Sequence, residues 1–431
     1  MTKNELKEHV LQNIDGERAV RLLKSLIRIP SASGQPTLPQ ELVLQYFEQM
    51  GMQVDMFQGN DEEVKNLPDY CPLPPEENID SGAFNLVGVK KGKSRTGKSL
   101  MLFSHIDTEA PEPDSGGDPL QAYIRDGKLY GLGAADAKSG IAIMLAAAQA
   151  VLKETELDGE LILMSILGKK GGSAGTLSAV SRGYHADGGV YIHAAETGHG
   201  FQEIKCYSMG TIDFRVIVKG SGGAPNDELD DSEVNAVEKG ALVIRALREW
   251  DSGRRSRLMF KQGTYEGSPN TKLHIGLAQG GTYVGKDPLS FEVQCRLYFG
   301  VGETIESVLA DLNQYLTEAL SGDPWLREHM PVIEKMYLRA SPAETDTSEA
   351  IHTAAKDSII GITGTNEIIY QYHGASDIRL PVLYGNTPTV GIGPKCGGLY
   401  GQETVDWVDL EDFLTGIKIC AALIIDWCLE D

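Results

Sequence analysis

The chain has 431 residues, too many for one ordinary core, so two domains are expected. Hydrophobic residues make up 41% and charged residues 23%, a composition typical of a soluble globular protein. Its formal net charge of −22 argues against nucleic-acid binding, because phosphate contacts need a basic surface. A local basic pocket could still bind an anionic small molecule, so the charge does not exclude a carboxylated substrate.

The N-terminal segment MTKNELKEHVLQNIDGERAV is polar and amphipathic and does not resemble a secretory signal peptide. No apolar run reaches the roughly 18 residues that a membrane-spanning helix needs. The six cysteines show no paired spacing, which favours free thiols over disulfides or a zinc ribbon. We therefore expect a cytoplasmic protein that does not act at a membrane.

The first hundred or so residues alternate between helical and extended patterns. The spacing of apolar residues predicts helices within 4–28 and over 39–51, whereas 60–81 lacks a clear period and predicts a long loop. Strands are expected over 85–90 and 99–104.

Two polar side chains follow the second of these strands. Residues 100–103 form an apolar run typical of a buried parallel strand, and His105 and Asp107 stand at its C-terminal end. Ligands and catalytic groups of open α/β sheets lie at such strand ends. An imidazole can bind a metal, and a carboxylate two residues later can orient the ring. The alternative for His105 is a hydrogen-bonded core histidine.

A turn rich in glycine and alanine presents Asp136 at the start of an apolar helix that we expect over 138–151. Gly131 and Gly133 allow close backbone approach, and small neighbours leave room beside the carboxylate. The alternative is that Asp136 caps the helix. Two polar sites at the ends of two elements favour a functional site over both structural alternatives.

The segments SHIDT and GKLYGLGAADAKSG together resemble the family of metallopeptidases that includes aminoacylase, acetylornithine deacetylase and succinyl-diaminopimelate desuccinylase. Members show His-x-Asp, then Leu-Tyr-Gly-Arg-Gly-x-x-Asp-x-Lys-Gly-Gly, and carry two zinc-type ions bridged by the second Asp. The resemblance extends over essentially the whole chain. It implies an α/β fold, with a zinc-peptidase-like catalytic domain of mixed sheet flanked by helices, plus an inserted α+β lid and dimerisation domain.

After the apolar helix, 159–167 and 189–194 predict two buried strands. Alternating strands and helices then form a block that resembles the family's lid. We expect 1–207 and 340–431 to form the catalytic metal-binding domain and 208–339 the lid. The lid implies a homodimer or an assembly of dimers.

The resemblance also implies a metal site made by His105, Asp136 and Glu196, with Asp107 orienting His105. An imidazole and two carboxylates suit Zn²⁺ or Mn²⁺.

The residues for a second metal differ from the family pattern. Where the family has a Glu-Glu pair, whose members bind metal and act as general base, this chain has Lys169-Lys170. The late family histidine falls at Leu399, and no histidine follows His373. A lysine here would also repel a second dication. These differences predict one divalent transition metal per chain, Zn or Mn.

Other polar residues are candidates for catalysis. Lys169 could bind a substrate carboxylate or neutralise an acidic cleft, and Lys170 could stabilise developing negative charge. His373 is a candidate ligand or acid–base group, whereas His193 on an apolar strand is expected to be a core residue. The segment GASDIRL resembles the family's Gly-Gly-Thr-Asp-Ala-Arg. The predicted catalytic set is Asp107, Lys169, Lys170, His373, Asp377 and Arg379.

The predicted function is a metal-dependent hydrolase that cleaves a C–N bond other than a peptide bond in a small carboxylated substrate, with a metal-activated water. Two versions remain open: amide hydrolysis, or hydrolytic deamination of an activated aromatic amine, as in the nitroanthranilate aminohydrolases of this family. The alternative is a non-catalytic metal-binding or scaffold homologue. A scaffold has no reason to keep His105, Asp136 and Glu196 together.

Overall fold

The computed structural model describes residues 1–32, 39–59, 62–71, 84–94, 96–111, 118–168, 172–195, 197–221, 233–261, 266–398 and 405–430, without the side chains of 62, 63 and 373. The chain divides into two compact units, Met1–Ser208 with Ala343–Asp431, and Met209–Pro342. The expected lid, 208–339, begins one residue before the first residue of the second unit and ends three residues before its last residue.

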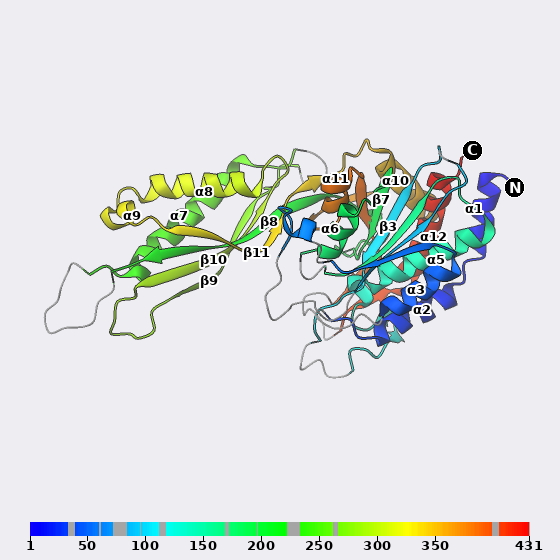
Figure 1. Ribbon diagram of the computed structural model, residues 1–431, viewed down its shortest axis with the longest axis horizontal. Helices are drawn as coiled ribbons and strands as arrows, with labels where there is room; N and C mark the ends of the chain where they lie inside the picture. Colours follow the sequence, from blue (N-terminus) through cyan, green and yellow to red (C-terminus); the bar gives the residue numbers. More distant parts are fainter. Residues whose placement is uncertain are drawn as a thin grey trace. The chain divides into compact units, whose positions relative to one another are not determined.

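A mixed sheet forms the centre of the first unit (Figure 1). Strand β3 runs parallel to its neighbours β6 and β7, and β14 runs parallel to β7. Antiparallel pairing adds β2 and then β1 at one side and β8 at the other. The sheet order is β1 (Gln53–Phe57), β2 (Asn85–Lys90), β6 (Leu161–Ile166), β3 (Leu100–His105), β7 (Gly188–Ile192), β14 (Thr389–Ile392) and β8 (Glu203–Lys219), with β12 (Ala343–Glu344) and β13 (Ile369–Gly374) also paired to β8.

Helices cover both faces of this sheet. On β3, Leu100 and Leu102 join a large core cluster with the first group of helices, while Met101 and Phe103 face a second cluster that includes Ala179 of α6. This alternation with period two is what a strand buried on both faces requires. The first group is α1 (Lys3–Gln12), α2 (Gly16–Arg28), α3 (Pro39–Gln49), α5 (Ser139–Glu154), α10 (Ala350–Thr363) and α12 (Leu410–Cys428); the second face carries α6 (Ala174–Ser181), α11 (Arg379–Gly385) and the short α4 (Glu62–Lys65).

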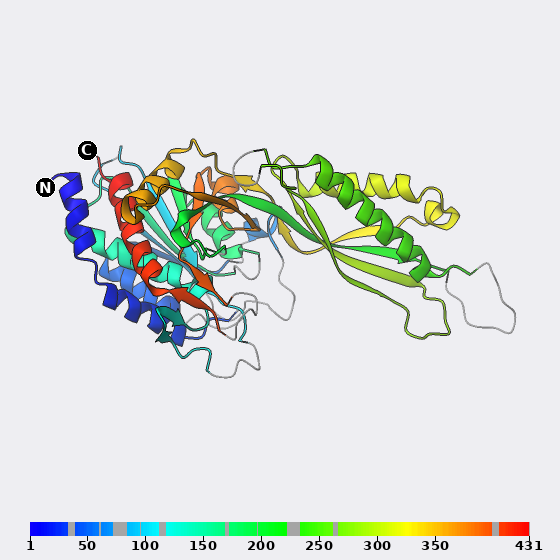
Figure 2. The ribbon, with the colours of Figure 1, turned by 180° about the vertical axis from the view of Figure 1, so that it is seen from behind.

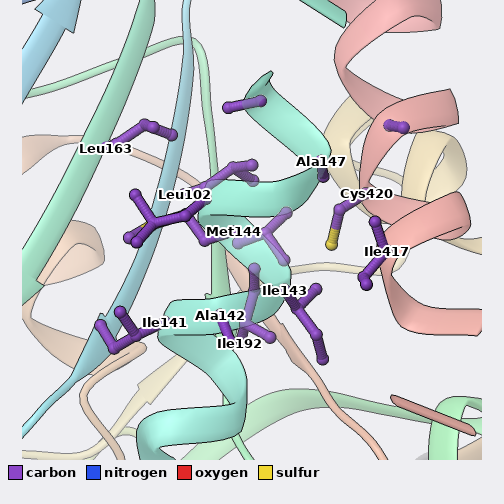
Figure 3. Packing of buried hydrophobic residues seen from close by; sticks show 14 of the residues in the cluster. Leu102, Ile141, Ala142, Ile143, Met144, Ala147, Leu163, Ile192, Ile417 and Cys420 are labelled. Carbon is purple, nitrogen blue, oxygen red and sulfur yellow. The ribbon is translucent and has the colours of Figure 1, made fainter. Parts of the chain in front are cut away.

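Helix α5 is the central helix of the first unit. Figure 3 shows Ile141 and Met144 against the sheet residue Leu102, with Ile417 and Cys420 of α12 on the other side. The segment Ala134–Glu154 is apolar and long enough to cross a membrane by composition alone. A helix packed between a sheet and another helix must be apolar on most sides, which accounts for that composition.

The ends of the chain meet at one place in the first unit (Figures 1 and 2). Helix α1 packs against α12, and the Lys3 ammonium donates a hydrogen bond to the carbonyl oxygen of Leu429 at 2.7 Å. All six cysteines lie in the described part of the chain and are buried, and none forms a disulfide, as expected from their spacing.

A small antiparallel sheet lies next to the turn that precedes α5. Its order is β15 (Cys396–Gly397), β16 (Trp407–Asp409), β5 (Lys128–Tyr130) and β4 (Tyr123–Arg125). It joins a segment near the C-terminus to the strand that leads into the Asp136 turn.

The second unit is an antiparallel sheet covered by helices. The later part of β8 pairs with β10 on one side and β11 on the other, and β9 forms the edge beyond β10. The alternating burial along β10 fits a sheet with one covered face. Its elements are α7 (Ala236–Arg257), β9 (Lys272–Gly280), β10 (Ser290–Phe299), α8 (Ile305–Leu320), α9 (Pro324–Glu328) and β11 (Val332–Ala340).

Candidate metal centre

Three side chains from three separate elements converge at the C-terminal edge of the central sheet. His105 is the last residue of β3, His193 directly follows β7, and Asp136 lies in the turn before α5. The Nε2 atoms of His105 and His193 lie 2.7 and 2.9 Å from the same oxygen, Asp136 Oδ1. The possible ligand atoms of all three lie within 4.8 Å of one another, close enough for the three side chains to hold one metal ion.

Strand pairing explains why the two histidines meet. Strands β3 and β7 are parallel neighbours, with Phe103 opposite Tyr191. Two residues further along, this register brings His105 level with His193, and their rings lie 5.7 Å apart. Both side chains therefore leave the sheet at the same edge, where functional groups of α/β proteins gather.

The electrostatic potential among His105, Asp136 and His193 favours a positive charge, either a proton on an imidazole or a bound cation. Burial alone would lower the pKa of His105, but the carboxylates of Asp136 and Asp107 raise it to about 9. Burial alone would raise the pKa of Asp136, yet the two imidazoles hold it well below its usual value. A divalent ion would meet the same negative potential as the histidine proton, so the residues present fit a bound cation.

Asp107 fixes the His105 ring from its other side. His105 Nδ1 lies 3.0 Å from the backbone oxygen of Asp107 and 3.4 Å from its carboxylate oxygen Oδ1. A partner at Nδ1 sets the ring orientation and leaves Nε2 directed at Asp136. This is the geometry expected of an orienting residue.

The Asp136 carboxylate does not cap α5. It faces the two histidines, and α5 begins at Ser139 with no side-chain hydrogen bond at its N-cap, Lys138. Lys138 is buried and donates a hydrogen bond from Nζ to the Ile29 carbonyl oxygen at 2.9 Å. Burial lowers the pKa of Lys138 to about 7. The structural alternative for Asp136 is therefore wrong.

The structure does not describe the side chains of four predicted site residues. Three of them, Lys169, Lys170 and Glu196, lie outside the described residues. Leu399, at the position of the late family histidine, also lies outside them. His373 belongs to β13, but its side chain is outside the described part of the structure.

Asp377 and Arg379 lie in a buried polar network next to α6 and α11. Asp377 accepts hydrogen bonds from the hydroxyls of Ser173 and Thr176, both at 2.5 Å. Arg379 Nε lies 3.4 Å from Asp69 Oδ1, and each of these two side chains is only 1% exposed. The same Asp69 also accepts a hydrogen bond from the Tyr384 hydroxyl at 2.7 Å. These contacts account for the burial of both residues, and their catalytic role stays a prediction.

The sequence interpretation missed His193. We expected a core residue, and it is indeed buried, but its Nε2 atom is directed at Asp136. The signal was present, because His193 directly follows an apolar strand, much as His105 ends one. Its partner Asp136 lies 57 residues away, so the sequence pattern alone did not connect them.

The family of the chain follows from comparison with known proteins. Residues 101–426 match the family described as Peptidase family M20/M25/M40. The chain belongs to this family. The predicted resemblance and the predicted α/β fold class are thereby confirmed.

Curated relatives of this M20 chain include hydrolases of small molecules. N-formyl-4-amino-5-aminomethyl-2-methylpyrimidine deformylase of Bacillus subtilis is 28% identical, covering 96% of this chain and 95% of the relative. Succinyl-diaminopimelate desuccinylase of Nitrosococcus oceani is 25% identical, covering 78% and 85%. The predicted enzyme class, a hydrolase acting on C–N bonds other than peptide bonds, is confirmed by this family and these relatives.

Solved structures share the M20 fold. Aminopeptidase PepT from Bacillus cereus superimposes with a TM-score of 0.72 at 18% identity, covering 96% of this chain and 99% of that one. The YxeP protein of Bacillus subtilis, described as a dinuclear metal-binding peptidase, gives a TM-score of 0.62 at 13% identity, covering 96% and 98%.

Proposed function

We propose that this M20 protein is a metal-dependent amidohydrolase that cleaves an acyl C–N bond in a small carboxylated substrate. The observation that carries the proposal is the convergence of His105, Asp136 and His193 on one point at the carboxyl edge of the sheet. Two buried imidazoles and a partly buried carboxylate, gathered at the carboxyl edge of the sheet, are a ligand set that suits a hydrolytic metal.

We propose one divalent ion per chain at this cluster. Two imidazoles and a carboxylate suit Zn²⁺ best, with Mn²⁺ as the second candidate. Glu196 follows His193 by three residues and remains a predicted ligand. Lys169-Lys170 in place of the Glu-Glu pair, and the lack of any histidine after His373, support a single ion.

When bound, an ion of this kind would supply a water whose pKa is lowered to about 7 and would polarise the carbonyl group of the substrate. The protein's own residues supply the rest of the proposed chemistry. Asp107 keeps His105 oriented, while Lys169 and Lys170 bind the substrate carboxylate and offset the charge that develops on the carbonyl oxygen. His373, Asp377 and Arg379 complete the predicted catalytic set.

The relatives favour amide hydrolysis over aromatic deamination. The names of the deformylase and the desuccinylase both describe removal of an acyl group from an amine of a small molecule. We therefore propose an N-formyl or other N-acyl amine as substrate. We also propose a cytoplasmic homodimer or assembly of dimers, on the resemblance of 208–339 to the family lid.

The test is metal analysis of purified protein, followed by a panel of N-formyl, N-acetyl and N-succinyl amines together with aminobenzoates. We expect one Zn²⁺ or Mn²⁺ per chain and chelator-sensitive release of an acyl group. His105→Ala should abolish both, while the exposed His185→Ala should leave both unchanged. Two ions per chain at saturation would contradict the single-ion site, and activity that survives thorough chelation would contradict the metal-dependent reaction. A metal-binding protein inactive on the whole panel would favour the scaffold alternative.

A further inference from the structure

We propose that Asp406 is a positioning residue for the metal centre, because it holds the turn that presents Asp136 to His105 and His193. The inference rests on the proposed function, since it concerns the same site. Asp406 lies at the far end of the chain, and no part of the predicted ligand or catalytic set includes it.

The contact is made by three hydrogen bonds to one short turn. The Gly133 N–H donates to Asp406 Oδ1 at 3.0 Å, and the Ala135 N–H donates to Oδ2 at 2.9 Å. The Gly131 N–H donates to the backbone oxygen of Asp406 at 3.0 Å. Alternate N–H groups of the turn therefore point to the same residue, and Ala135 directly precedes the proposed ligand Asp136.

This turn has few hydrogen bonds of its own. The Leu132 N–H donates to the Pro119 carbonyl oxygen, and the turn's own hydrogen bonds run from the Ala134 N–H to the Gly131 oxygen and from the Lys138 N–H to the Gly133 oxygen. Gly133 has a φ of +85°, a left-handed conformation that directs successive N–H groups to one side. A Cβ atom at Gly133 would also lie 2.7 Å from Thr108 Cγ2, so the turn packs closely against Thr108 at this position.

Asp406 is itself held in place. It directly precedes β16, in which Trp407 pairs with Tyr130 at the end of β5, the strand that leads into the turn. Asp406 is 8% exposed, so its acceptors are withdrawn from water. Removing the carboxylate would leave the Gly133 and Ala135 N–H groups buried without acceptors, which raises the free energy of the folded state. A shift of the turn that lets these groups find other acceptors would lower it again.

A shift of the turn would move the Asp136 carboxylate relative to two histidines that the sheet holds in place. Residues that orient metal ligands typically contribute about 10–100-fold to metal affinity. We expect Asp406→Asn, which retains one acceptor oxygen, to weaken Zn²⁺ binding by roughly 10-fold and Asp406→Ala by up to about 100-fold. Asp406→Glu should restore part of the loss.

Asp409→Asn is the matched control. Asp409 ends β16, the strand that follows Asp406, and caps α12 by accepting the Asp412 N–H, a role that Asn fills equally well. The experiment measures the Zn²⁺ dissociation constant by chelator competition and backbone hydrogen exchange on the metal-free full-length chain. We expect faster exchange confined to 131–138 in the Asp406 variants and wild-type behaviour in the control.

Each outcome decides the inference. Weaker Zn²⁺ binding with local exchange supports it. Unchanged affinity despite faster exchange, or faster exchange spread over the whole chain, would show that Asp406 is structural only. A wild-type protein that binds no Zn²⁺ would overturn the proposed function and the metal part of this inference, while exchange at 131–138 would still report whether Asp406 holds the turn.

Discussion

At the scale of single residues, one carboxylate oxygen organises the candidate centre. Asp136 Oδ1 lies within hydrogen-bonding distance of both His105 and His193, so each histidine depends on the other's placement. We therefore expect the metal affinity to be sensitive to each of the three residues.

His193 gives the clearest residue-scale prediction. His193→Ala should weaken Zn²⁺ binding by more than the roughly 10–100-fold that is typical of residues behind the ligands, because a direct ligand is lost. Chelator competition measures the change, with His185→Ala as an exposed control. Wild-type affinity in His193→Ala would leave His105, Asp136 and Glu196 as the ligand set.

A pH effect is expected at the start of α12. Burial raises the pKa of Asp412 above its usual 3.8. The folded state then binds this proton more readily than the unfolded state, so its contribution to stability is present below about pH 3.8 and is lost as pH rises through the higher folded value.

Asp412→Asn removes this titration. The free energy of unfolding of the variant should therefore increase relative to that of wild type as pH rises from about 4 toward neutrality, so the variant becomes relatively more stable. Urea unfolding at several pH values measures the difference. A pH-independent difference would contradict the raised pKa.

At the scale of elements, close packing between α5 and the sheet sets the position of the site. Gly140, in the first turn of α5, lies against β7, and a Cβ atom there would overlap the carbonyl oxygen of Ile192, the residue before His193. Backbone cannot yield as a flexible side chain can. The helix thus approaches the strand as closely as a glycine allows.

Gly140→Ala should destabilise the protein by about 1–3 kcal/mol, the usual cost of overpacking, and should also weaken metal binding. Gly253→Ala in α7 is the control, because a Cβ atom there meets nothing within 4 Å. Helix propensity predicts that this control is neutral or stabilised by up to about 1 kcal/mol. Urea unfolding measures the free energy of unfolding of both variants. Equal changes in the two would contradict the claim that the close approach of α5 to β7 sets the position of the site.

At the scale of the whole molecule, the three described residues of the candidate centre all belong to the first unit: His105 ends β3, His193 directly follows β7, and Asp136 lies in the turn before α5. The second unit has its own hydrophobic cluster. A bound ion should therefore stabilise the first unit selectively.

We expect Zn²⁺ at 100 times its dissociation constant to stabilise the first unit by about 2.7 kcal/mol, because the ion binds only the folded state. Hydrogen exchange with and without chelator measures the stabilisation of each unit separately. Protection of 209–342 to the same extent would contradict binding confined to the first unit.

Local patterns in the sequence were sufficient for much of this description. Apolar runs predicted the buried strands β3, β6 and β7, because a strand covered on both faces must be apolar throughout. Short motifs around His105 and Asp136 predicted a site at the strand ends, since the residues that shape each turn are adjacent in the chain.

Only the tertiary structure placed His193 beside Asp136, and Asp406 beside the turn that carries Asp136. His193 is 57 residues from Asp136, and Asp406 is 271 residues from Ala135. No local periodicity relates such distant residues. The parallel register of β3 and β7 brings His193 to Asp136, and the pairing of β16 with β5 brings Asp406 to the turn, because hydrogen-bonded strands fix which distant residues become neighbours.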